Sequence, residues 1–278
     1  MSGATLGLAP LRALRLPPLG LMLAWAVVAV LLAWAFVPGF FAWQDPLAGI
    51  AGRQLEPPSF EHPLGTDGLG RDMLARVIHG ARESLLGAFL AVSVGLVFGT
   101  ALGLLAGARG GVTDAAVMRL VDTLLAIPSL LLSLSVIILL GFGSINAAIA
   151  VGFVSVAHFA RLSRTEVLRV RRAEYVEAAF GSGGRFLAVL WRHVLPNAMT
   201  SVLALAALQF GSAILALATL GFLGYGAPPP TPEWGLLIAE GRDFLATAWW
   251  LTAAPGLVVV LAVLSTERIS RSLGARRT

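Results

Sequence analysis

The chain alternates long apolar runs with short polar segments that carry most of its charge. A membrane-spanning helix needs about 20 apolar residues. Uncharged runs of at least this length lie at residues 16–44, 84–108, 123–160, 194–232 and 244–266. The run at 123–160 is too long for one span, and the "GFGSIN" stretch at 141–146 divides it into a hairpin. Pro128 and Pro255 fall inside spans, where neighbouring helices are expected to satisfy the freed backbone groups. The pattern predicts an all-α, polytopic membrane protein with about six transmembrane helices.

The arginines gather in segments that fall on one side of this six-span arrangement. They are Arg12, Arg15, Arg109, Arg119, Arg161, Arg164, Arg169, Arg171, Arg172, Arg185, Arg192, Arg268, Arg271, Arg276 and Arg277. The opposite side holds residues 39–83, with six acidic residues against four arginines, and the loop at 233–243. Basic loops remain in the cytoplasm. Both termini are therefore predicted to be cytoplasmic, and residues 161–193 form the largest inner loop.

Composition narrows the class of protein further. The 278 residues are 57% hydrophobic and 13% charged, against about 25% charged in soluble domains. The absence of cysteine excludes disulfides and cysteine-based metal or redox sites. The net charge of +5 lies in the inter-span segments, so it does not indicate nucleic-acid binding. We expect no cleavable signal peptide, because the apolar run after Arg12 and Arg15 is too long.

Few ionisable residues lie within the predicted spans. Arg119 and Asp122 lie near the inner end of span three, and His158 toward the inner end of span four, where we expect it to be packed or hydrogen-bonded. Proton-coupled carriers use more such groups than this. The chain is therefore either a passive pore, or its energy comes from another chain.

The sequence gives little reason to expect covalent catalysis. Ser144 and His158 are a conceivable nucleophile and base, but their separation across a hairpin gives them no particular reason to meet, and Ser144 is a typical turn residue. The four histidines show no metal-ligand spacing. "GARGG" at 107–111 does not match a phosphate-binding loop and is better interpreted as an inner turn.

Span two carries a glycine at every fourth position. These residues are Gly95, Gly99, Gly103 and Gly107. Such a ridge along one helix face lets another helix approach closely. We expect it to serve helix packing, with contact to a partner span in a translocation core as the alternative.

The segment "EYVEAAFGSGG…WRHVLPN" at 174–197 resembles the "EAA" loop of permease subunits of bacterial ATP-binding-cassette importers. The matching positions are Glu177, Ala178, Ala179, Gly183, Leu195 and Pro196. Three further stretches, at 62–85, 118–132 and 222–244, look like the C-type permease of the dipeptide, oligopeptide and nickel branch. The resemblance covers about residues 60–264.

The resemblance implies the type I importer permease fold and a complex of two permeases, two ATPases and an extracytoplasmic binding protein. In that family the loop is a coupling helix that sits in a groove on the ATPase. Glu174, Tyr175 and Ala178 share one face by their spacing. Gly183 permits a turn that a side chain hinders, and Pro196 suits the start of span five. The alternative is an ordinary interfacial amphipathic helix.

Two features depart from the family pattern. Phe180, Gly181 and Ser182 stand where a basic residue and then small and large apolar residues usually follow "EAA", so the coupling helix is expected to be shorter. The C-terminal "STERISRSLGARRT" also differs from the usual ending. Both departures suggest a divergent subgroup.

The outer segment before span two carries a second candidate site. Thr66, Asp67, Gly70, Arg71 and Asp72 look like a turn that leads into a short helix, with Thr66 or Asp67 as the N-cap. We expect this segment to pack over the outer mouth and to shape a gate beneath the binding protein. A solvated helix entry is the alternative.

Together these features predict a multi-pass permease subunit of the inner membrane, with no cofactor and no catalytic or metal site. Residues 1–83 are interpreted as the N-terminal segment, first span and outer loop, and residues 84–278 as the permease core, with the coupling loop at about 163–193. The expected partners are a homologous B-type permease, two ATPase subunits, a binding protein and membrane lipid, but not nucleic acid. Peptides are the expected substrate; nickel or a metal chelate is the alternative, and an ATP-independent channel or scaffold is the alternative class.

Overall fold

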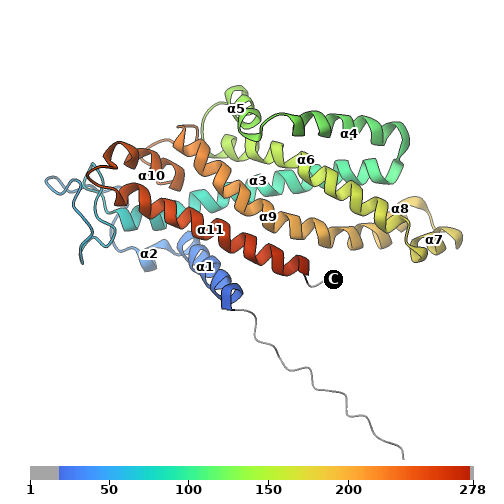
Figure 1. Ribbon diagram of the computed structural model, residues 1–278, viewed down its shortest axis with the longest axis horizontal. Helices are drawn as coiled ribbons and strands as arrows, with labels where there is room; N and C mark the ends of the chain where they lie inside the picture. Colours follow the sequence, from blue (N-terminus) through green and yellow to red (C-terminus); the bar gives the residue numbers. More distant parts are fainter. Residues whose placement is uncertain (1–18, 276–278) are drawn as a thin grey trace, which may run out of the picture.

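The computed structural model describes residues 19–275 and shows an elongated bundle of helices (Figure 1). Arg12, Arg15, Arg276, Arg277 and the start of the predicted first span lie outside these residues. In the described part no strand forms. One isolated antiparallel bridge joins Gly49 to Arg71, and another joins Thr66 to Asp72. The helices are α1 (Leu19–Phe36), α2 (Pro38–Phe41), α3 (Met73–Arg109), α4 (Gly111–Ala126), α5 (Ser129–Leu140), α6 (Ser144–Arg171), α7 (Glu174–Gly181), α8 (Phe186–Val189), a π-helical turn (Leu190–Val194), α9 (Leu195–Phe222), α10 (Trp234–Gly241), a 3-10 turn (Arg242–Phe244) and α11 (Trp250–Ala275).

Five helices in the described chain are long and apolar enough to cross a membrane, and a bent pair makes a sixth candidate. The bent pair is α4 and α5, whose axes differ by 99°. The prediction of about six spans is therefore confirmed, but the third span is broken. Pro128 lies at the break, not inside a straight helix, and Ile127 before it is extended with φ −86° and ψ 133°. Proline disfavours helical geometry in the residue that precedes it.

The other spans lie where predicted, but several ends differ: α1 ends at Phe36, α6 continues to Arg171 and α9 ends at Phe222. The hairpin turn at 141–146 is confirmed, because Gly141 and Gly143 adopt positive φ between α5 and α6. Span two begins eleven residues earlier than predicted, since α3 starts at Met73 and not Ser84. Span six begins later, at Trp250, and Pro255 does lie inside it.

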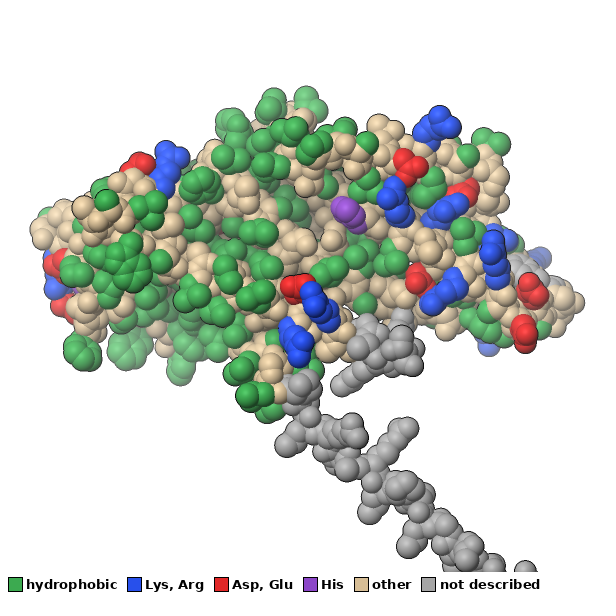
Figure 2. All heavy atoms as spheres, viewed as in Figure 1, with side chains coloured by type: hydrophobic (Ala, Val, Ile, Leu, Met, Phe, Trp, Pro, Cys, Tyr) green, Lys and Arg blue, Asp and Glu red, His purple; other side chains and the backbone are tan. Residues whose placement is uncertain are grey.

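Charge marks the two ends of the molecule. In Figure 1, α10 and the chain before α3 lie at one end of the long axis, and α7 and α8 lie at the other. Figure 2 shows charged side chains toward these ends of the visible face and a smaller group near the middle of its lower edge, with hydrophobic side chains over much of the surface between the ends. This distribution is that of a protein whose middle lies in a membrane.

The four glycines of the predicted ridge, Gly95, Gly99, Gly103 and Gly107, lie against α6, where they let α3 and α6 approach closely. A Cβ at Gly95 would lie 2.6 Å from Cβ of Ser155, and one at Gly99 would lie 2.5 Å from the carbonyl oxygen of Val156. One at Gly107 would lie 2.9 Å from Val167. Side chains of any size at these positions would push the helices apart, so the contact between α3 and α6 depends on glycine.

Candidate functional site

The EAA-type segment forms a compact structure between α6 and α9 at one end of the bundle (Figure 1). A cluster of buried apolar residues lies beneath it and joins α3, α6, α7, α8 and α9. Its members are Ala108, Val167, Val170, Val176, Val189, Leu190, Val194 and Ala198. Most members are β-branched, and such side chains have few rotamers, so the cluster is rigid. It therefore fixes α7 to the bundle, and α7 is not a loose loop.

Helix α7 turns one apolar residue inward and its motif residues outward. Val176 is fully buried, whereas Glu174, Tyr175, Glu177 and Ala178 are exposed. Among the described residues, neither glutamate makes a hydrogen bond or ion pair through its side chain. The Tyr175 ring lies 6.5 Å from that of His193. The outward face of α7 is therefore charged, unpartnered and anchored from below.

Two consecutive glycines end α7 in different ways. Gly183 has φ +82° with open space around it. The N–H of Gly184 donates to the carbonyl of Ala179 at 3.0 Å. A left-handed residue followed by a bond of this kind is the Schellman ending of a helix. The sequence pointed to Gly183 but missed Gly184, where a Cβ would lie 2.6 Å from the Ala179 carbonyl oxygen and 2.8 Å from Val189.

Arg171 joins the start of the EAA-type segment to the C-terminal end of α3. Its Nη1 donates to the carbonyls of Gly107 at 2.8 Å and Ala108 at 2.7 Å. These are among the last carbonyls of α3, which have no partner within the helix, and a cation is favourable at a helix C-terminus. Sequence reasoning treated Arg171 only as a positive charge, and nothing in its spacing indicates this bond.

The approach to α9 differs from the expected helix start. The chain is helical from Phe186 through the π turn into α9, so Pro196 does not open span five as a free first turn. The N–H of Leu195 bonds to the carbonyl of Leu190, five residues back. The wider π turn makes room just before the proline ring, which otherwise clashes with the preceding turn. Asn197 Nδ2 also donates to the carbonyl of His193 at 2.7 Å.

At the opposite end, the outer segment leads into a long helix and not a short one. Asp72 is the N-cap of α3, and its Oδ2 accepts from the N–H of Ala75 at 2.7 Å. The expectation that Thr66 or Asp67 is the N-cap is therefore wrong. Thr66 instead accepts from the N–H of Glu56 at 2.9 Å, and Gly70 makes a turn at φ +75°.

Four charged residues form a buried network beneath this segment. Asp67 Oδ2 accepts from Arg71 Nε at 2.7 Å and from Arg76 Nη1 at 2.6 Å. Arg76 Nη1 also donates to Glu240 at 2.6 Å, which links α3 to α10. Arg76 is fully buried. Burial raises the pKa of the Asp67 carboxyl, but hydrogen bonds from the backbone N–H groups of Arg71 and Leu69 and the guanidinium charges outweigh burial and leave that pKa below its usual value.

Histidine and tryptophan side chains complete the outer structure, and the sequence did not single them out. His62 is buried, and its Nδ1 lies 2.9 Å from Asp72 Oδ1. Trp234, at the start of α10, is fully buried and donates from Nε1 to the carbonyl of Val77 at 3.0 Å. Burial raises the pKa of the neighbouring Glu233 carboxyl, which accepts from the N–H of Ala227 at 2.6 Å. The Trp234 bond holds α10 onto α3, and the other two fix the loops before these helices.

Ser144 and His158 do not form a catalytic pair. Both lie on α6 itself and not on two arms of a hairpin. Fourteen residues of helix separate them by about 21 Å along the axis. Ser144 is the first residue of α6 after the Gly143 turn, as a turn residue would be.

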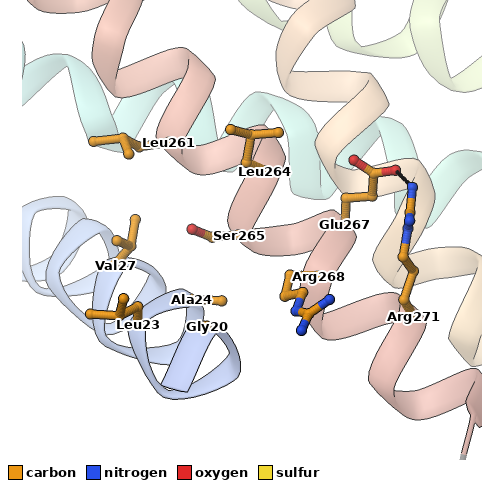
Figure 3. A pocket seen from close by; sticks show the side chains of 10 residues that line it. All are labelled: Gly20, Leu23, Ala24, Val27, Leu261, Leu264, Ser265, Glu267, Arg268 and Arg271. Atoms are coloured by element: carbon orange, nitrogen blue, oxygen red, sulfur yellow. Dashed lines mark hydrogen bonds and ion pairs between the residues drawn. The ribbon is translucent and has the colours of Figure 1, made fainter. Parts of the chain in front are cut away.

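A hollow of about 440 Å³ lies between the beginning of α1 and the end of α11 (Figure 3). Its lining residues are Gly20, Leu23, Ala24, Val27, Leu261, Leu264, Ser265, Glu267, Arg268 and Arg271. Arg268 extends from α11 toward Gly20, and Arg271 pairs with Glu267. The hollow therefore shows that the two ends of the described chain lie side by side.

Comparison with known proteins identifies the chain through most of its length. A model of the family described as "Binding-protein-dependent transport system inner membrane component" matches residues 99–278. The di/tripeptide transport system permease protein DppC of Pseudomonas aeruginosa is 46% identical over 202 residues, which cover 73% of this chain and 67% of the relative. The dipeptide permease DppC of Alkalihalophilus pseudofirmus is 42% identical over 220 residues, which cover 79% and 72%.

The fold has a counterpart among solved structures. One chain from an inward-facing crystal form of the MetNI methionine ABC transporter matches with a TM-score of 0.57 and 18% identity, over 72% of this chain and 97% of that chain. This likeness shows that the importer permease fold predicted from the sequence is present.

The predicted class of protein is thereby confirmed. The relatives are permease subunits and not enzymes, and the family's transport depends on a binding protein. The resemblance to a permease of an ATP-binding-cassette importer, with an ATPase and a substrate-binding protein as partners, holds over the matched residues. The chain belongs to the family of binding-protein-dependent transport system inner membrane components.

Proposed function

We propose that this chain is the permease of a peptide importer, that it pairs with a homologous B-type permease, and that α7 couples it to two ATPase subunits. The substrate follows from the relatives, which are named as dipeptide and di/tripeptide permeases. The outward face of α7 is the observation that carries the coupling role: among the described residues it presents Glu174 and Glu177 without bonded partners and an exposed Tyr175, while buried Val176 fixes the helix from below.

The geometry of α7 suits the transmission of movement. Helix α7 lies between α6 and α9, so a displacement of α7 acts on both through short connections. Ala178 and Ala179 are small and allow a partner surface to approach. Gly183 and Gly184 fix the end of the helix, and Leu195 and Pro196 lie where the segment enters α9. A rigid element docked in a groove can push on the spans, whereas a mobile loop absorbs the push.

The orientation belongs to the same proposal. Arginines surround α7, and the beginning of α1 lies beside the end of α11 at the rim of the hollow in Figure 3. Basic segments stay in the cytoplasm. We therefore place both termini and residues 161–193 inside, and residues 39–83 outside.

At the outer end, the segment containing Thr66, Asp67, Gly70, Arg71 and Asp72 would form the surface that receives the binding protein. Asp67, Arg71 and Asp72 are buried, so they would fix the shape of this surface and not touch the partner themselves. Exposed apolar residues are available for contact, since Phe60 and Leu69 project into solvent. Such a surface would pass a substrate from the binding protein to the mouth between the permeases.

The test uses the complex of this permease, its B-type partner, the ATPases and the binding protein, reconstituted in vesicles. Glu177→Ala removes the carboxylate on the outward face, and Glu267→Ala is the control at the end of α11. Removing one partner of a buried charge pair in an interface costs about 2–5 kcal/mol. We expect Glu177→Ala to lower binding-protein-stimulated ATP hydrolysis and dipeptide uptake at least about tenfold, with normal membrane insertion, and Glu267→Ala to change neither.

Each other outcome has a distinct meaning. Normal stimulation and uptake in Glu177→Ala would contradict the coupling role. Flux through the isolated chain without ATP would instead show a channel. Uptake of nickel but not of a dipeptide would show that the substrate is a metal.

A further inference from the structure

A cavity of about 530 Å³ opens between the beginning of α5, the first half of α6 and the second half of α9. Its size is typical of a small-molecule site. The polar side chains that line it include Ser133, Ser155, His158, Gln209, Ser212 and Thr219. The lining contains no arginine and no carboxylate. Since α6 and α9 are candidate membrane spans, this is a concentration of polar groups without arginine or carboxylate between spanning helices.

Three of these side chains have no partner for their polar atoms among the residues that the structure describes. Gln209 is half-buried and its amide makes no hydrogen bond, His158 is exposed without a bonded neighbour, and Ser133 is 4% exposed with a free hydroxyl. The other three hydroxyls bond to carbonyls of their own helices, as Ser155 does to Val151 at 3.1 Å. The unpartnered groups can therefore be used by something in the cavity.

Lipid is a poor occupant for such a surface. Moving an amide from water into a medium that cannot form hydrogen bonds is strongly unfavourable. Polar residues at membrane depth therefore face a water-filled path or other polar groups. His158, predicted to lie toward the inner end of its span, is near the middle of α6, because that helix continues to Arg171. Gln209 holds the corresponding place in α9.

The break in the third span adds backbone donors. Helix α5 begins at Ser129, after the bend at Pro128, and both Ser129 and Leu130 line the cavity. The first N–H groups of a helix have no partner within it. Interrupted helices are tolerated in a membrane where they border a cavity.

We propose that this cavity is the part of the translocation pathway that contacts the peptide, and that Gln209, His158 and Ser133 bind its main-chain amide groups. A peptide bond offers one N–H and one C=O. A glutamine amide and a neutral imidazole can each donate and accept, so the lining matches any peptide regardless of its side chains. Because the described lining has no arginine or carboxylate to form an ion pair with the peptide, the peptide can dissociate again. The proposal rests on the proposed function, because it takes the substrate to be a peptide.

The first test uses single cysteines, since the chain has none of its own. Gln209→Cys and Ser212→Cys should react with a small charged thiol reagent in the assembled transporter, and a loaded binding protein with ATP should change their rates. Leu208→Cys is the matched control, because Leu208 neighbours Gln209 on α9 but does not line the cavity. If the two cavity cysteines react no faster than the control, the site is covered by lipid or by a partner and the proposal is wrong.

The second test measures transport. Gln209→Leu keeps the size of the side chain and removes its amide, and the loss of one hydrogen bond to the peptide should lower uptake about 3- to 10-fold. Leu208→Ala should leave uptake unchanged. Retention of the ATPase and stimulated ATP hydrolysis report on the coupling role of α7, and both should remain normal in Gln209→Leu. A failure of the coupling role is therefore distinguishable from a failure of the cavity proposal. Unchanged dipeptide uptake in Gln209→Leu would overturn the proposal.

Discussion

Three glycines at the end of α7 provide a quantitative test of the coupling segment, because the same substitution should have three different effects. Gly181 is the last residue of α7, has ordinary φ and has nothing near the position of a Cβ. Gly183 has the same free space but φ +82°. Gly184 has no positive φ, but a Cβ there would lie 2.6 Å from a backbone oxygen.

The magnitudes follow from these surroundings. Gly181→Ala removes backbone freedom from the unfolded segment and should stabilise it by about 0.5–1 kcal/mol. Gly183→Ala forces a side chain into the left-handed region, which costs about 1–2 kcal/mol. Gly184→Ala brings the new methyl group against the Ala179 carbonyl and Val189, and overpacking of this kind costs about 1–3 kcal/mol. A cost of 1.4 kcal/mol lowers the ratio of docked to undocked segment about tenfold.

Hydrogen exchange of residues 174–189 in the purified complex measures this ratio directly. Protection should rise slightly in Gly181→Ala and fall in the other two variants. Stimulated ATP hydrolysis should follow the same order. Equal effects of all three substitutions, or a larger loss in Gly181→Ala than in Gly184→Ala, would refute the reasoning from φ and contact distance.

Three further predictions concern the topology, the core and the outer network. Ser182→Cys should resist an impermeant thiol reagent added outside, whereas Ser59→Cys should react. Labelling of Ser182→Cys from outside would show that the orientation is the opposite of the one proposed. Gly99→Ala should destabilise the protein by about 1–3 kcal/mol in a thermal melt. The new methyl group of Gly87→Ala meets only the end of a leucine side chain at 3.2 Å, so this control should cost far less. Equal losses of stability would contradict the close contact of Gly99 with α6. Asp67→Asn removes the buried carboxylate shared by Arg71 and Arg76, leaves them only the partly exposed Glu240, and should cost about 3–5 kcal/mol. Since the pKa of Asp67 is lowered, its contribution should persist at neutral pH and disappear below about pH 4; a melting temperature equal to that of the unchanged protein at pH 7 would contradict the network.

Most spans could be predicted from the sequence, because the length of an apolar run is a direct measure of what crosses a bilayer. The early start of α3 could not, because residues 73–83 are rich in charge and look like a loop. Arg76 is tolerated there because it pairs with Asp67 and with Glu240, which is 164 positions away, and no local pattern links Arg76 to Glu240. The bend at Pro128 is signalled by proline, but the angle of 99° depends on how α5 packs on α6.

The candidate site was predictable where function depends on a local motif and not where it depends on contacts between distant segments. The outward residues of α7 follow from helical spacing, and Gly183 follows from its family position. Gly184 has a role only because Val189 folds back onto it. The cavity residues Gln209 and His158 are single polar residues in apolar runs, and only the packing of α6 against α9 brings them to one space.

The proposed coupling segment and the proposed peptide-binding cavity are connected by two helices. Helices α6 and α9 flank the coupling segment in the chain and also line the cavity, with His158 on one and Gln209 on the other. The apolar cluster beneath α7 includes residues of both helices, and Arg171 joins the end of α3 to the same body. An ATPase that moves α7 must therefore move the inner ends of these helices together. Because α5 packs on α6, and the ion pairs Arg161–Asp122 and Arg164–Asp114 join α4 to α6, both halves of the broken span would shift with α6. Such a movement would change the width of the cavity, and with it the distance between the groups that we propose bind the peptide.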